Sequence, residues 1–375
     1  MRLVADSGLW RMGPAIADVP LAAVLEVDGA VLAWTVDEPA SDNAQITLTD
    51  TGRTDWLWRV LGEPGHRAVA DAALPSPDHD AGVDLSGVEV RPGALDNLRR
   101  LALGHWLRRW WPASVRDGIA GLDTALLDAE IALLTAEAED FVGEDTLDAD
   151  IGALLAPHAP AFTMHLVLGD PRVVDLVDRC VELAQDVGVD GPGWAELAEA
   201  VENRTASPTS AHRDDYALAA GADTGPLPAG VIARGAASVA WSGVPGSVFD
   251  AAEDTISWAV AADGDHVSAV LHVAALGPGS PAGIPVELRC NGFTASGVLN
   301  ESGRAAMELR DTTNQPVTAT AAWDQDWEST TVTVGAPTVE PAEARERARR
   351  FARQRLAAPG SDAYLAEILA AESEY

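Results

Sequence analysis

The sequence contains no lysine, since all 25 basic residues are arginine. Without a primary amine side chain, the chain has no Gly-Lys-Ser/Thr phosphate loop, no lysine Schiff base with pyridoxal phosphate and no phosphate-anchoring lysine of the protein-kinase type. These enzyme classes are therefore excluded. We favour codon drift in a GC-rich genome as the reason, because it also fits the alanine, glycine, aspartate and arginine usage; selection against lysine-directed tagging or trimming is the alternative.

Cysteine is almost as scarce, with two residues in 375. Two thiols cannot build a disulfide framework or a thiolate zinc site. Cys180 shares helical spacings with Val177 and Ala184, and Cys290 alternates with Leu288, so we expect both to be inert core residues. A Gly-x-Ser-x-Gly elbow and an EF-hand calcium loop are also absent. The sequence thus predicts no catalytic residue, no metal ligand and no cofactor.

Basic residues are scarce compared with acidic ones: the chain has 58 acidic and 25 basic residues and a net charge of −33. A chain this acidic is repelled by phosphate backbones and anionic headgroups, which disfavours nucleic-acid and membrane partners. The first residues lack the basic and then apolar pattern of a secretory signal. We also expect no apolar run near the roughly 18 residues of a membrane helix. Together these features predict a cytoplasmic protein.

The N-terminal part of the sequence has β character. Asp28-Gly29 lies between two apolar runs, which is typical of a hairpin, and a third strand is expected at 45–48. Residues 54–61 are predicted to form a short helix capped by Thr54, and the many breaker residues of 63–92 indicate a long loop.

A helical pattern follows, and the spacing then changes to short alternating runs. Helices are expected at 93–111, 122–142, 148–155, 170–188 and 193–203, with His158 and His165 in a loop around Pro160. Strands are expected at 257–260, 266–273, 286–290, 294–299, 305–309, 317–321 and 330–334. Two helices, 342–356 and 362–371, close the chain.

These patterns predict an α+β fold with a small N-terminal β unit, a central helical domain, a C-terminal antiparallel β-sandwich and a two-helix tail. The expected bounds are 1–62 for the β unit, 63–92 for the loop, 93–204 for the helical domain, 205–229 for a linker, 230–336 for the sandwich and 337–375 for the tail.

Two stretches carry a resemblance to known families. VELRCNGFTASGVLNESGRAAMELRD, at 286–311, with the later strand VTVG, resembles prealbumin-like and carboxypeptidase-regulatory-like sandwich domains. This resemblance implies an interaction or scaffolding module. HWLRRWWPASVRDGIAGLDTALLDAE, at 105–130, looks like accessory proteins encoded with NTPase and caspase-like protease conflict systems of high-GC actinobacteria. That resemblance implies an NTPase, protease or sensor of the same system as the partner.

Arginine gathers in two places, which are the candidate partner-binding residues. The first group lies among Trp106, Trp110 and Trp111 and consists of Arg99, Arg100, Arg108 and Arg109. The second consists of Arg345, Arg347, Arg349, Arg350, Arg353 and Arg355. Stacking on single-stranded nucleic acid is one interpretation of the first group, but we favour ion pairs within the protein. A basic terminal helix either docks on the acidic body or binds a partner, and both alternatives stay open.

The function expected from these observations is that of a non-enzymatic adaptor, scaffold or substrate subunit in a cytoplasmic bacterial multi-protein system, plausibly one of defence. The alternative is a metal-dependent hydrolase whose histidine and acidic ligands come together across domains.

Overall fold

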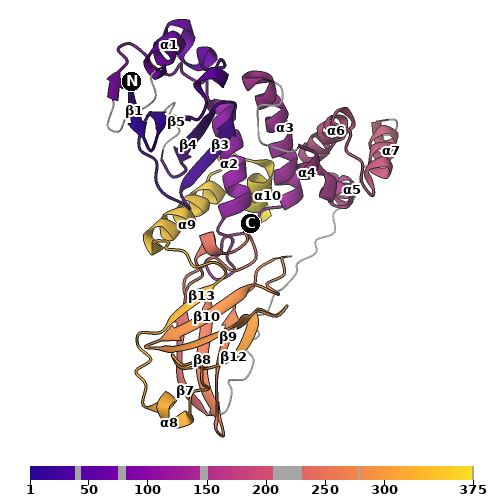
Figure 1. The fold of residues 1–375 in the computed structure, drawn as a ribbon. Helices are drawn as coiled ribbons and strands as arrows, with labels where there is room; N and C mark the ends of the chain where they lie inside the picture. The colour runs from indigo at the N-terminus through magenta and orange to yellow at the C-terminus, as the bar shows by residue number, and fades with distance from the viewer. Residues whose placement is uncertain (39–43, 75–81, 144–150, 206–229, 278, 374–375) are drawn as a thin grey trace. The chain divides into compact units, whose positions relative to one another are not determined.

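A computed structural model describes residues 1–38, 44–74, 82–143, 151–205, 230–277 and 279–373 (Figure 1). The chain divides into two compact units. The first unit comprises Met1–Arg108, Leu122–Asp215 and Gln354–Tyr375, and the second comprises Arg109–Gly121 and Tyr216–Arg353. The α+β fold class is confirmed. The predicted linker 205–229 lies outside the described residues except for its first position, which ends a helix.

The first unit opens with a six-stranded antiparallel sheet of order β3-β4-β5-β2-β1-β6. Its strands are β1 (Arg2–Asp6), β2 (Leu9–Met12), β3 (Ala22–Val27), β4 (Ala30–Thr35), β5 (Gln45–Leu48) and β6 (Gly82–Asp84). The predicted hairpin is confirmed between β3 and β4, where Gly29 has φ +69 and a Cβ would lie 2.3 Å from the Asp50 carbonyl oxygen. The strand at 45–48 is also confirmed, whereas β1 and β2 were not predicted.

Helix α1 (Leu57–Ala73) corrects two predictions. It begins after Trp56, and the Thr54 hydroxyl donates to the Thr51 carbonyl oxygen instead of capping the helix. It also covers 63–73 of the stretch 63–92 that was expected to be a loop. Gly62, with φ 74, separates two helical segments there, and Pro64 occupies the first turn of the second. A proline in a first turn costs no helical hydrogen bond, so the breaker residues mark a kink.

The remaining helices of the first unit are α2 (Asp96–Trp110), which continues into the second unit, α3 (Thr124–Val142), α4 (Ile151–Leu155), α5 (Ala159–Leu168), α6 (Pro171–Asp186), α7 (Trp194–Thr205) and α10 (Leu365–Ser373). The predicted start of α6 is confirmed, because Asp170 accepts from the Arg172 N–H at 2.9 Å ahead of Pro171. The predicted loop around Pro160 is wrong. Residues 156–158 form a 3-10 turn, and Pro160 lies in the first turn of α5, where proline is tolerated.

Tyr364 ties the end of the chain to α2. Its ring is fully buried, and its hydroxyl donates to the Arg100 carbonyl oxygen at 2.6 Å. Gly104 permits this contact, because a Cβ at that position would lie 2.2 Å from the tyrosine oxygen. The C-terminal helix is therefore part of the first unit's core.

The second unit is the predicted antiparallel sandwich. One sheet has the order β12-β9-β8-β7 and the other the order β11-β10-β13. Their strands are β7 (Val231–Ala237), β8 (Ile256–Asp263), β9 (His266–Val273), β10 (Pro285–Cys290), β11 (Phe293–Val298), β12 (Arg304–Glu308) and β13 (Thr331–Val334). Side chains of both sheets share one core, with Val260 and Leu271 from one and Val286 and Leu288 from the other.

One predicted strand of the sandwich is wrong. Residues 317–321 lead into a short helix, α8 (Ala319–Trp323). Thr318 caps the N-terminus of this helix, because its hydroxyl accepts a hydrogen bond from the Ala321 N–H. A threonine cap followed by alanines favours helix over strand. The seventh strand is instead β7, which was not predicted.

Candidate interaction surfaces

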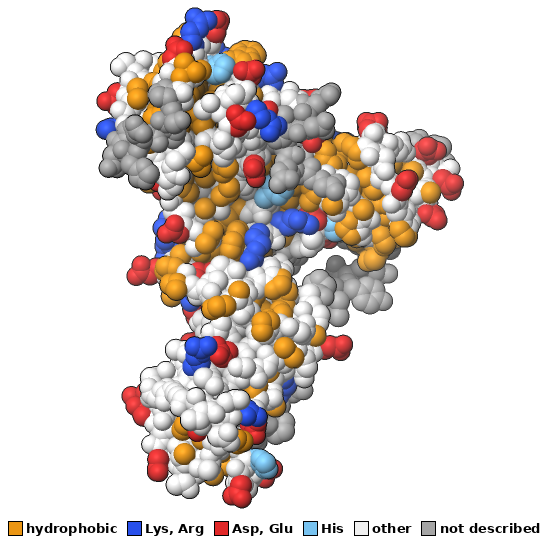
Figure 2. Space-filling model, in the orientation of Figure 1, with side chains coloured by type: hydrophobic (Ala, Val, Ile, Leu, Met, Phe, Trp, Pro, Cys, Tyr) orange, Lys and Arg blue, Asp and Glu red, His pale blue; other side chains and the backbone are white. Residues whose placement is uncertain are grey.

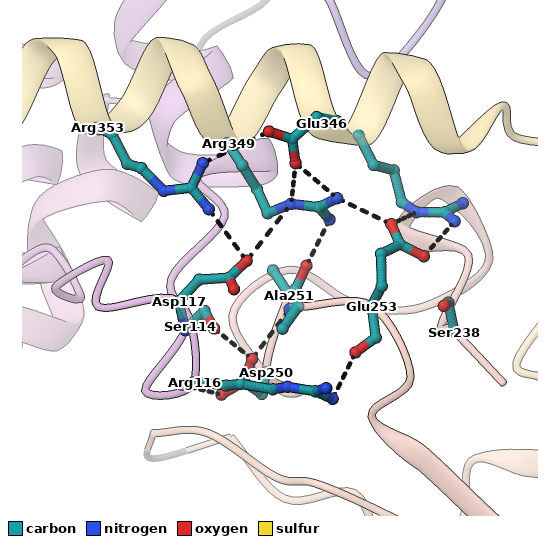
Figure 3. A network of polar contacts seen from close by, with 12 residues as sticks. Ser114, Arg116, Asp117, Ser238, Asp250, Ala251, Glu253, Glu346, Arg349 and Arg353 are labelled. Atoms are coloured by element: carbon teal, nitrogen blue, oxygen red, sulfur yellow. Dashed lines mark hydrogen bonds and ion pairs between the residues drawn. The ribbon is translucent and has the colours of Figure 1, made fainter. Parts of the chain in front are cut away.

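The arginine-rich helix α9 (Ala342–Ala357) extends from the second unit into the first. In the second unit, Arg345 is buried and donates from both Nε and Nη2 to the Glu253 carboxylate, at 2.9 and 2.8 Å. Arg349, which is 3% exposed, donates to the Ala251 carbonyl oxygen at 3.0 Å and pairs with Glu253 at 3.0 Å. Figure 3 shows Arg349 pointing from α9 toward Ala251 and Glu253.

Two aspartates extend this network to neighbouring loops (Figure 3). Asp117 pairs with Arg349 at 3.5 Å and with Arg353 at 3.3 Å. Asp250 is buried and accepts from the Ser114 hydroxyl at 2.6 Å and from the Val115 and Ala252 N–H groups at 2.9 Å. Because the carboxylates of Glu253 and Asp117 face the guanidinium groups within one unit, this helix face is occupied internally, while Asp250 holds the neighbouring loops together.

Glu253 gives this network a pH dependence. Burial by itself raises the pKa of the Glu253 carboxyl, but hydrogen bonds from Arg345, Ser238 and Arg349 and the charge of Arg345 outweigh burial and lower the pKa to about 2. A depressed pKa in the folded state stabilises the protein above the unfolded value of about 4.3, and this stabilisation is lost as the pH falls toward 2.

We therefore expect the stability difference between the native protein and Glu253→Gln to shrink as the pH falls from about 5 to about 2. Urea unfolding of both proteins at several pH values measures this difference. Glu301→Gln removes an exposed carboxylate from the same unit and serves as the control. A difference between the native protein and Glu253→Gln that stays constant over the window would contradict the assigned role.

The end of α9 makes a second buried ion pair in the first unit. Arg355 donates from Nη2 to the Glu367 carboxylate at 2.7 Å and from Nη1 to Asp362 at 3.2 Å. Glu367 is 0% exposed and also accepts from the Tyr364 N–H at 2.9 Å. This cluster fixes the start of α10.

The arginines of α2 are paired as well. Arg99 lies 3.4 Å from Asp362, Arg100 donates to Glu130 at 2.8 Å and Arg108 lies 2.7 Å from Asp128. In the second unit, Arg109 donates to the carbonyl oxygens of Trp241 and Val244, at 3.1 and 2.9 Å, and stacks over Trp110.

Eight of the ten candidate partner-binding arginines thus make the internal contacts given above. Of the other two, Arg347 is half-buried and has an interaction within the protein, while Arg350 is exposed. For α2 this agrees with the internal role that we favoured. For α9 it favours docking on the protein's own carboxylates, and binding of a partner by these arginines stays a prediction.

Asp128 is the best candidate for a chemical site. Its carboxylate is buried between Arg108 and the His158 ring, whose Nε2 lies 2.9 Å away. Burial lowers the pKa of His105, and the charge of nearby Arg108 adds to this effect. No group of three or more histidine, cysteine or acidic side chains is placed to hold a metal among the described residues.

Both cysteines are core residues, as predicted. Cys180 is 0% exposed, and burial raises the pKa of its thiol to about 12. Cys290 is 1% exposed on the inner face of β10.

Helix α5 presents an exposed apolar surface on the first unit. Phe162 is fully buried and packs edge-on against Trp194, with ring centroids 5.9 Å apart. On the opposite side of the helix, Met164, Val167 and Leu168 are 69%, 71% and 57% exposed. We call these three side chains the α5 outer face. Figure 2 shows hydrophobic side chains gathered over this part of the chain. Large apolar side chains grouped on one helix face normally pack against a core or a partner.

The same segment corrects the expectation about apolar runs. Ile151–Leu168 is 18 residues long, mostly apolar and without Asp, Glu, Lys or Arg, although it contains His158 and His165, so by length and composition alone it qualifies as a membrane-span candidate. Of its residues, 28% are buried, and the segment is divided into α4, the 3-10 turn and α5 around Pro157 and Pro160. Buried core helices meet the same criterion, which makes it weak evidence for a span.

A groove of about 290 Å³ separates the end of α6 from α7 in the same unit. Its walls are mostly small or apolar and include Val181, Ala184, Trp194 and Ala198, with Asp190 as the charged member. The groove and the α5 outer face belong to one group of three helices, because α5 packs against both α6 and α7.

Comparison with family models, with curated proteins and with solved structures finds no match for this chain. The function is therefore argued from the surfaces described above.

Proposed function

We propose that this chain is a non-enzymatic adaptor, scaffold or substrate subunit of a cytoplasmic bacterial multi-protein system, and that it contacts its partner through the α5 outer face. The observation that carries the proposal is the exposure of Met164, Val167 and Leu168 on a helix without Asp, Glu, Lys or Arg. The resemblance of residues 105–130 supports an NTPase, protease or sensor of the same system as that partner.

Energetics favour such a contact. Full burial of a Val, Leu or Met side chain contributes about 1.5–3 kcal/mol, and more than half of each of these three side chains is in water. Large apolar residues grouped on one helix face are typical of protein interfaces, whereas single exposed ones are ordinary. Eight of the ten candidate arginines contact carboxylates or carbonyl oxygens of the protein itself, so we propose the α5 outer face as the contact, and partner binding by the arginines stays a prediction.

Site-specific photo-crosslinking tests the proposal. A benzoylphenylalanine at Val167 is expected to form a covalent adduct with one defined protein in cells, because a partner covers that position. The same group at Val298, an exposed valine of the second unit that is 60% exposed, serves as the control and should give no such adduct.

The captured protein, once purified, should bind Met164→Glu/Val167→Glu at least about tenfold more weakly than the native chain. Equal binding, or adducts only at the control position, would overturn the proposal. Point variants are preferable to truncation, because the C-terminal part of the chain supplies buried residues such as Arg349 and Tyr364.

A further inference from the structure

We propose that strand β7 of the second unit binds an extended segment of another protein by β-strand addition, and that this segment carries an acidic residue beside Arg234. The inference concerns a surface other than the α5 outer face and does not rest on the proposed function. Three features of the second unit lead to it: the unpaired backbone edge of β7, the half-buried apolar side chains along that edge and the exposed charge of Arg234.

Strand β7 is an open sheet edge. It stands last in the order β12-β9-β8-β7 and pairs with β8 alone (Figure 1). In an antiparallel ladder, the N–H and C=O groups of alternate residues point away from the paired strand. Within the described part of the chain, no hydrogen bond joins the backbone of 231–237 to anything besides β8. A strand added on this side would therefore meet a row of available donors and acceptors.

This edge lacks the features that protect most natural edges, which are short length, proline and several charges. Strand β7 has seven residues, no proline and one charged residue, Arg234. The edge of the other sheet on the side of β13 has only four residues. On the opposite side, β11 is linked to the end of β12 by the bridge between Thr294 and Arg310. Among the edges of the sandwich, β7 is therefore the one best suited to accept a strand.

The core side of the edge is apolar and incompletely covered. Ala233 and Ala237 pack against the sandwich core but are only half-buried. Gly235 pairs with Trp258 of β8, and a Cβ on this glycine would lie 2.5 Å from the indole ring. The ring thus reaches beneath the outermost strand, where glycine leaves room for it. Apolar side chains on one face of an added strand would complete the cover of this side.

The solvent side of the edge carries a positive charge. Arg234 is the fourth of the seven residues of β7, it is exposed, and no carboxylate among the described residues pairs with it. Opposite charges on directly facing residues stabilise a strand pair, and like charges destabilise it. A segment with aspartate or glutamate opposite Arg234 and apolar residues on its other face therefore matches both sides of the edge.

A second copy of this chain fits the edge less well. The two-fold axis of a symmetric antiparallel pair with full overlap would pass through the middle of β7. The two Arg234 side chains would then face one another, which is unfavourable. The charge of the edge therefore favours a segment of a different protein.

The test uses a labelled nine-residue peptide, Ser-Val-Thr-Val-Asp-Val-Thr-Val-Ser, and the full chain in fluorescence anisotropy. The valines share one face of the extended peptide, and the aspartate is at the centre of the other. We expect saturable binding, with slower hydrogen exchange at 231–237 and unchanged exchange at 159–168, because the outward N–H groups of β7 become bonded. The absence of saturable binding up to about 1 mM would overturn the inference.

Backbone methylation separates strand addition from other modes of binding. Two further peptides carry N-methyl groups, one on the three central valines and the other on the aspartate and both threonines. Only alternate N–H groups of an added strand face β7, so one of these peptides should bind at least about tenfold more weakly and the other like the parent. Equal affinities of the two methylated peptides would contradict strand addition.

Arg234→Glu tests the charge beside the added strand. The variant should bind the peptide about tenfold more weakly, and a peptide with arginine in place of the aspartate should recover the affinity. Arg350→Glu makes the same charge change at an exposed position of α9 and should alter neither affinity. Both substituted side chains are exposed, so both variants should fold, which circular dichroism checks. Equal losses for the two variants would show general attraction between opposite charges and would overturn the assigned role of Arg234.

Two outcomes fix the relation of this inference to the other surfaces. Val167→Glu on α5 should leave peptide binding unchanged, so failure of the α5 contact and failure of strand addition are separate results. A dimer in analytical ultracentrifugation that the peptide dissociates would assign β7 to a second copy of this chain and overturn the inference of a different protein.

Discussion

Replacing Glu367 with alanine should destabilise the first unit by about 3–5 kcal/mol. The carboxylate is fully buried, and its removal leaves the Arg355 guanidinium without its main counter-charge and the Tyr364 N–H without its acceptor. Breaking one side of a buried ion pair is costly, because the remaining charge has already lost its water. The affected helix α10 holds Tyr364 against α2 through the hydrogen bond to Arg100.

Urea unfolding combined with hydrogen exchange measures this effect. Exchange is needed because a chain with two units does not have to unfold in one step, and peptides from α2, α3 and α10 report on the first unit. Glu372→Ala is the matched control. It removes a carboxylate from the same helix that pairs with Arg172 at the surface, so the loss should stay below about 1 kcal/mol. Similar losses for both variants would contradict a structural role for the Arg355–Glu367 pair.

Replacing Arg349 with alanine should have an effect of similar size, about 3–5 kcal/mol, in the second unit. The side chain is 3% exposed, and its removal leaves the Ala251 carbonyl oxygen without its arginine donor and the Glu253 carboxylate with Arg345 as its remaining arginine partner. Asp117 also loses one of its two arginine partners. Three chain segments that meet at this guanidinium would therefore lose their common contact.

The neighbouring residue, Arg350, provides the control variant for Arg349→Ala. It is exposed, so Arg350→Ala should change stability by no more than about 0.5 kcal/mol. Hydrogen exchange in the second unit should increase for Arg349→Ala alone. Equal stability of the two variants would show that the internal network contributes little, and it would return α9 to consideration as a partner-binding helix.

Local signals in the sequence predicted a large part of the fold. The Asp28-Gly29 hairpin, the capped start of α6 at Asp170 and the alternation along β9 each depend on residues close together in the chain. The burial of Cys180 and Cys290 followed from the same spacings. Such features could be predicted because turn and cap geometry and side-chain periodicity are properties of short segments.

The errors arose where a local signal had two meanings. Gly62 and Pro64 mark a kink within α1, Pro160 lies in the first turn of α5, and Thr318 caps a helix where a strand was expected. Proline and glycine occur both in loops and at helix starts. Only the contacts of the flanking residues show whether such a residue lies in a loop or at the start of a helix.

The sequence by itself determined that this protein is acidic, lacks lysine-dependent chemistry, has an α+β fold and holds both thiols in its core. Whether the arginine clusters face inward or outward was decided only by the tertiary structure, because ion-pair partners such as Glu253 for Arg345 are distant in the sequence. The exposure of Met164 and Val167 was decided in the same way. Helix α5 has apolar residues on opposite sides, with Thr163 and His165 as its polar residues, so its sequence does not mark which apolar side packs. The contact of Phe162 with Trp194 fixes the side that remains in water.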